Sequence, residues 1–144
     1  MSDRLTSLPD GLGDLVDRVP DEDILGCLHA LAVAALSVVG YYAGEAEDAL
    51  SELRDRGTVL ASKRMAVNAL FAQRQQFGFA AGRRGDIVMR DKVFYEARAL
   101  NCVVYAVGAV GESPRQRLRE AAYEAATAFR GTSGVVSVVS RYAG

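Results

Sequence analysis

Apolar residues recur at the three- and four-residue spacing of an α-helix along most of this 144-residue chain. The pattern predicts helices over about 22–56, 59–81, 87–110 and 114–130, preceded by a weak helical segment within 1–20. The connections between them are short, which favours antiparallel neighbours and hence an up-and-down bundle. The sequence therefore predicts an all-α fold: a single domain over 1–144, with four main helices plus a short N-terminal helix.

Capping residues mark where two of these helices begin. Asp86 precedes the helix over 87–110 and is a favourable N-cap residue. Ser113, followed by Pro114 and Gln116, forms a capping-box arrangement at the start of the last helix. These signals are local, so they predict helix starts without reference to the tertiary fold.

Helical periodicity also predicts which face of two helices is buried. On the last helix the expected core residues are Leu118, Ala121, Ala122, Ala125 and Phe129, and the outward residues are Gln116, Arg119, Tyr123 and Thr127. On the helix over 59–81 the expected core residues are Ala66, Leu70, Phe77 and Ala81, and the outward residues are Arg64, Asn68 and Gln75.

The stretch ILGCLHALAVAALSVVGYYAG, over 24–44, has no charge except a potential one on His29. It is long enough to cross a bilayer, which takes about 20 apolar residues. Acidic residues flank it on both sides, however, with no lysine or arginine close by. The other helices are amphipathic and need an apolar partner. We therefore expect this stretch at the centre of a soluble, cytoplasmic bundle; the polar N-terminus also lacks the pattern of a signal peptide.

Charge is distributed unevenly between the two parts of the chain. Residues 1–57 hold 12 acidic and 4 basic residues, a net charge of −8, and residues 58–144 hold 6 acidic and 13 basic residues, a net charge of +7. The parts can neutralise each other within one fold or across a dimer. The tail over 131–144 is apolar and could form either a strand or a helix. These two features lead us to expect a homo-oligomer, most simply a dimer.

Few residues are available for metal or cofactor chemistry. His29 is the single histidine, so a zinc or di-iron site with several histidines cannot form within one chain. Cys27 and Cys102 lie in apolar runs, far apart in sequence, and we expect two buried free thiols. We therefore expect no metal and no cofactor. Arginine greatly outnumbers lysine, and alanine and valine are abundant, a bias typical of GC-rich bacterial coding.

A polar and aromatic stripe runs along the helix over 87–110. Its members fall within an arc of about 80° on a helical wheel; they are Asp91, Phe94, Arg98, Asn101 and Tyr105. Glu96 lies on the opposite, apolar face. An unpaired buried carboxylate would have a raised pKa suited to acid–base chemistry. The alternatives are that Glu96 pairs with an arginine, or that it lies near enough to the helix start to reach water.

Acidic residues on the preceding long helix could complete this stripe. Tyr41 and Glu45 share one arc of the helix over 22–56. We expect Arg98, Asn101 and Tyr105 to line an internal polar seam that faces Glu45, because a buried charge without a partner costs several kcal/mol.

The basic residues do not form a recognisable nucleic-acid module. Arg115, Arg117 and Arg119 make a small patch near the start of the last helix, without the aromatic residues or the motif of such a module. We therefore expect neither a nucleic-acid nor a membrane partner.

The sequence favours a small bacterial accessory or binding protein. Such a protein would recognise a partner subunit or hold a small apolar ligand in its bundle. The alternative is a small cofactor-independent enzyme that uses the interior carboxylate or the histidine. The candidate ligand-binding residues are His29, Tyr41, Glu45, Glu96, Arg98, Asn101 and Tyr105.

Overall fold

The computed structural model describes residues 4–108 and 112–144, and these are mostly helical. The elements are the 3₁₀ turns η1 (Arg4–Ser7) and η2 (Asp21–Asp23) and the α-helices α1 (Leu12–Asp17), α2 (Ile24–Val39), α3 (Gly44–Arg56), α4 (Ala61–Arg83), α5 (Ile87–Val107), α6 (Pro114–Phe129) and α7 (Ser133–Val139). The predicted all-α class is confirmed, and the described residues include no strand.

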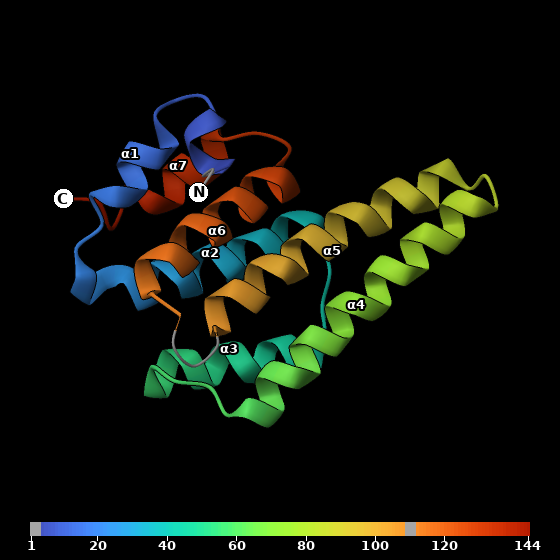
Figure 1. The fold of residues 1–144 in the computed structure, drawn as a ribbon, viewed down its shortest axis with the longest axis horizontal. Coiled ribbons are helices and arrows are strands. Elements are labelled where there is room, and N and C mark those ends of the chain that lie inside the picture. Colours follow the sequence, from blue (N-terminus) through green and yellow to red (C-terminus); the bar gives the residue numbers. More distant parts are fainter. Residues whose placement is uncertain (1–3, 109–111) are drawn as a thin grey trace.

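The centre of the molecule is formed by α2, α5 and α6, which pack against one another. On one side, α1 and α7 lie close to both chain ends, and on the other side α3 packs against α2, α4 and α5 (Figure 1). The two longest helices, α4 and α5, form an antiparallel hairpin whose distal part extends beyond the other helices (Figure 1). The fold is therefore a helical bundle with one projecting two-helix arm.

The single helix predicted over 22–56 is two helices in the structure. Gly40 has the left-handed φ of 68° and ends α2. Its N–H donates to the Ser37 carbonyl and the Tyr41 N–H donates to the Leu36 carbonyl, the two bonds of a Schellman motif. The chain then turns through three non-helical residues, and α3 begins at Gly44. The helix therefore ends at Gly40, where we expected it to continue. Glycine permits this end because it adopts the left-handed conformation without steric cost.

The apolar helix α2 is buried along one side. Its buried residues are Ile24, Cys27, Leu28, Leu31, Ala32, Ala35 and Leu36. Val33 and Val38 remain about half exposed. By length and composition, the 19-residue segment Asp21–Val39 could also cross a membrane. The helix packs against α3, α5, α6 and α7, so it has four helical neighbours but is not enclosed on every side.

The last long helix, α6, has the predicted core face. Leu118, Ala121, Ala122 and Ala125 are fully buried. Ser113 Oγ accepts a hydrogen bond from the Gln116 N–H at 3.4 Å, as expected for the predicted helix start. Arg119 was predicted to point outward. It is buried instead, and it donates to the Gly13 carbonyl and pairs with Asp17.

The predicted core face of α4 is wrong in part. The buried residues of this helix are Val67, Gly78 and Ala81, whereas Phe77, which we expected in the core, is half exposed. The reason is the close approach of α5: a Cβ atom on Gly78 would lie 3.3 Å from Val93 Cγ1. Gly78 therefore faces α5, and Phe77 and Phe79 lie at the sides of α4.

The C-terminal tail forms the helix α7 and packs on its own chain. Val135 and Val139 are fully buried, against α1, α2 and α6. The tail is therefore helical, of the two forms that the sequence left open. Its apolar residues contribute to the core of the same chain, so they give no support to a dimer.

Ion pairs join the acidic and basic parts of the chain within one molecule. Lys63 Nζ lies 2.6 Å from Glu52 Oε2, and Arg115 Nη2 lies 2.7 Å from Asp21 Oδ1. The Arg119–Asp17 pair joins the two parts in the same way. Part of the charge asymmetry is therefore neutralised inside the fold.

Candidate functional site

Arg98 and Asn101 on α5 bind a fully buried carboxylate. Arg98 Nη1 lies 3.0 and 3.2 Å from the two carboxylate oxygens of Glu124 on α6, and Asn101 Nδ2 donates to Glu124 Oε1 at 3.1 Å. The Glu124 side chain has no exposed surface. Three hydrogen bonds from two side chains compensate the loss of water around this charge.

The predicted partner of this seam was wrong. Glu45 is exposed on α3, and the carboxylate that Arg98 binds is that of Glu124. The helical break at Gly40 moves α3 away from the line of α2, whereas α6 lies directly along α5. A signal for Glu124 was present in the sequence: it is the charged residue between Ala121, Ala125 and Ala128 on the alanine-rich side of its helix.

A second ion pair joins α4 to α5. Arg74 Nη1 lies 3.3 Å from Glu96 Oε1, and Glu96 is 6% exposed. The Arg74 guanidinium also lies over the rings of Tyr41 and Phe77, 4.9 and 5.5 Å from their centroids. Of the possibilities for Glu96, pairing with an arginine is the one observed.

Aromatic rings also surround Arg98. Its guanidinium lies 5.4 Å from the ring centroid of Phe71 and 5.5 Å from that of Phe94, within the range of cation–π attraction. Arg98 Nε is buried without a hydrogen-bond partner. The Arg98 guanidinium is therefore held by the Glu124 carboxylate and by the rings of Phe71 and Phe94.

The other predicted site residues do not join this cluster. Tyr105 lies one turn beyond Asn101 and is half-buried; burial raises its pKa, and the negative charge of Glu120 adds to the effect. His29 and Tyr41 line a separate groove of about 510 Å³ near Arg54. Burial lowers the pKa of His29, and the nearby Arg54 charge adds to the effect. The seven candidates thus fall into several places and do not form one site.

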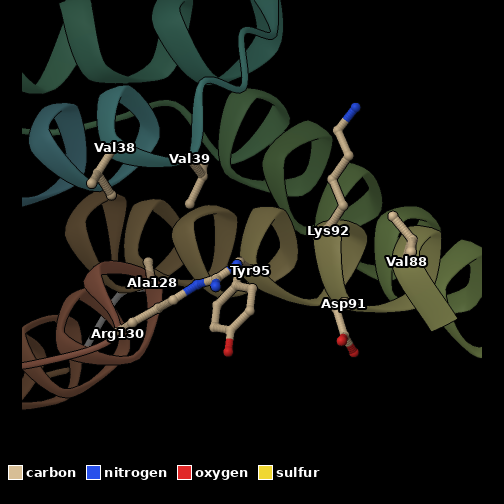
Figure 2. Close-up of a pocket in the computed structure, with 8 residues that line it drawn as sticks. All are labelled: Val38, Val39, Val88, Asp91, Lys92, Tyr95, Ala128 and Arg130. Atoms are coloured by element: carbon tan, nitrogen blue, oxygen red, sulfur yellow. The ribbon is translucent and has the colours of Figure 1, made fainter.

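Two open grooves lie along the hairpin. In the first, Arg130 lies over the Tyr95 ring at 3.9 Å, and Figure 2 shows both side chains beside the ends of α2 and α6. The second, of about 780 Å³, runs between α4 and α5 and includes Phe79 and Phe94. Both α2 and α6 end near Tyr95. The parts of α4 and α5 between Tyr95 and the hairpin turn therefore have neither α2 nor α6 beside them.

The exposed face of α4 has almost no charge. From Met65 to Gly82 the single charged residue is Arg74, which turns inward to Glu96. The exposed residues in this range are Met65, Asn68, Ala69, Ala72, Gln73, Gln76, Phe77 and Phe79. Solvent-facing helices are normally charged, whereas interfaces are poor in charge and rich in aromatic residues and methionine. This face was not predicted from the sequence, because helical periodicity placed Phe77 in the core.

The arginines at the start of α6 bind their own chain. Arg115 donates to the Val16 carbonyl at 3.0 Å as well as pairing with Asp21. Arg117 donates to the carbonyls of Tyr105 and Ala106, near the end of α5. These side chains therefore fasten the N-terminal segment and the end of α5 to α6.

Both cysteine thiols are buried, and we expect them to be unreactive while the protein is folded. Burial raises the pKa of Cys27 to about 12 and raises that of Cys102 as well. We expect neither thiol to react with an aromatic disulfide reagent at pH 8, and both to react in denaturant. Because the folded pKa of Cys27 lies above its ordinary value of 9.0, its contribution to stability is complete below about pH 9 and is lost as the pH rises toward 12. Fast labelling of either thiol in the folded protein would contradict its burial.

Comparison with protein-family models, with curated proteins and with solved structures finds no match to this chain. The fold and the polar interior define its class: an all-α bundle with internally paired carboxylates and a projecting hairpin. Among the described residues, no group of three or more histidine, cysteine or acidic side chains is arranged to hold a metal ion.

Proposed function

We propose that this chain is a small cytoplasmic accessory protein that binds a protein partner through the exposed face of α4. The observation that carries the proposal is the uncharged surface from Met65 to Phe79, on a hairpin that extends past the bundle (Figure 1). Met65 is 68% exposed and Phe79 is 53% exposed. Large apolar side chains gathered on an uncharged face are typical of a surface that another protein covers.

The paired interior favours binding over catalysis. Glu96 and Glu124 each accept a hydrogen bond from an arginine, so both carboxylates already have partners within the chain. His29 lies in a different groove from both. The grooves described above are open at the surface, which also favours a partner subunit over a small apolar ligand held inside the bundle.

Photo-crosslinking in cells of the natural host tests the proposal. A benzophenone amino acid at Phe79 is expected to form covalent adducts with a protein, because this position lies on the proposed interface. The same amino acid at Val33, an exposed apolar position on α2, is the matched control and is expected to form none. Absence of adducts from Met65, Ala72 and Phe79 in a folded protein would refute partner binding through α4.

A further inference from the structure

Five exposed residues of α4 form a stripe with heptad spacing, called here the α4 stripe. They are Met65, Ala69, Ala72, Gln76 and Phe79, separated by four, three, four and three residues. This is the spacing with which one helix packs along another in a coiled coil. On α4 the stripe faces away from α5, because Val67, Gly78 and Ala81 are the buried residues. The stripe is therefore arranged to receive a helix from outside the bundle.

We propose that the helix received is α4 of a second copy of this chain, antiparallel to the first across a two-fold axis near Ala72. This inference rests on the proposed function, because it names the partner of the same surface. A two-fold interface requires that one surface fit itself. The stripe has its large apolar residues, Met65 and Phe79, at the two ends, each seven residues from Ala72, with Ala69 and Gln76 between. Two antiparallel copies therefore approach closely at Ala72, with Ala69 of each copy near Gln76 of the other and Met65 opposite Phe79.

Charge supports a second copy over a charged partner. The α4 stripe carries no charge, and the nearby Arg74 is already paired with Glu96. Charged residues of another protein would lose water at this surface without finding an opposite charge, which is unfavourable. A second copy brings an equally uncharged surface.

The basic tip of the hairpin favours the antiparallel arrangement over the parallel one. Arg83 and Arg84 stand at the turn between α4 and α5 and are exposed. A parallel pair would place these arginines of both copies together. An antiparallel pair separates them by roughly the length of α4, about 34 Å for 23 residues. That separation is several times the Debye length of about 8 Å at physiological ionic strength, so the repulsion is screened.

Opposite charges at Ala72 test the arrangement directly, because this residue meets its own copy at the axis. Ala72→Glu and Ala72→Lys are each expected to be folded monomers, since each places like charges together. An equimolar mixture of the two is expected to form a heterodimer. Val33→Glu, which adds the same charge at a half-exposed position on α2 outside the α4 stripe, is the matched control and should dimerise like the original chain. Sedimentation, from about 1 μM to 1 mM protein, and native mass spectrometry give the assembly.

A cysteine at the axis provides a second test. Ala72→Cys is expected to give a covalent dimer when a mild copper oxidant takes one electron from each of two thiols, which release their protons as the disulfide forms. Val33→Cys, an exposed position on α2 outside the stripe, should give far less. The native Cys27 and Cys102 are buried and add no background.

The experiments distinguish a failure of dimerisation through α4 from a failure of partner binding through the same surface. If the original chain stays monomeric throughout the concentration range, or if the Ala72→Glu and Ala72→Lys mixture does not pair, the second copy is refuted. Adducts of Phe79 with a different protein would then leave partner binding intact and identify another occupant. If Phe79 and its neighbours on the stripe give no adducts of any mass, both proposals are refuted.

Discussion

Replacing Arg98 by methionine is expected to lower the free energy of unfolding by roughly 3–5 kcal/mol, the usual cost of breaking a buried ion pair. Methionine fills much of the same volume but leaves the carboxylate of Glu124 buried without its cation. The Asn101 amide alone remains as a donor to that carboxylate among the contacts described. Urea unfolding followed by circular dichroism measures the change.

The double variant Arg98→Met with Glu124→Gln separates the pair from its surroundings. Glutamine keeps the shape of Glu124 and can still accept a hydrogen bond from Asn101, so most of the lost stability should return. Arg83→Met, at the exposed tip of the hairpin, is the matched control and should change stability by less than about 0.5 kcal/mol. A single Arg98→Met variant no less stable than the double variant would show that the two charges are not coupled.

Replacing Leu118 by alanine is expected to cost roughly 2–5 kcal/mol, because the side chain is fully buried between helices and its loss leaves a cavity. Phe77→Ala removes a larger side chain from α4 and yet should cost clearly less, because half of Phe77 is exposed. Thermal and urea unfolding of both variants, at a protein concentration where the chain is monomeric, give the comparison.

The concentration matters because Phe77 lies beside the α4 stripe. An equal loss of stability in the two variants at low concentration would mean that Phe77 is buried in the monomer and that the described packing of α4 on α5 is wrong. A loss at Phe77 that grows with concentration would indicate that the residue contributes to assembly.

Local sequence signals predicted the helix starts well. Asp86 Oδ1 accepts a hydrogen bond from the Met89 N–H at 3.1 Å, and Ser113 has the equivalent role at the start of α6. These interactions span three residues, so the sequence contains both partners. The apolar core residues of α6 were also predicted well, because they recur on one side of the helix, whereas the burial of Arg119 and Glu124 was not predicted.

The core face of α4 was predicted wrongly in part, because this helix has no clear polar side. Phe77 and Phe79 are separated by about 200° around the helix, and both remain about half exposed. An apolar residue on such a helix can face the core, a neighbouring helix or a partner molecule. The close approach of α5 to Gly78 decided between these, and this contact belongs to the tertiary structure.

By itself the sequence determined the all-α class, most helix boundaries, the buried state of both cysteines and the polar character of the seam on α5. The tertiary structure alone decided that Arg98 binds Glu124 and not Glu45, and that α4 presents an uncharged face to solvent. A helical period gives the direction in which a side chain points along its own helix. The helical period does not determine where the neighbouring helix lies. That position follows from the turn at Gly40 and from the packing of α6 along α5.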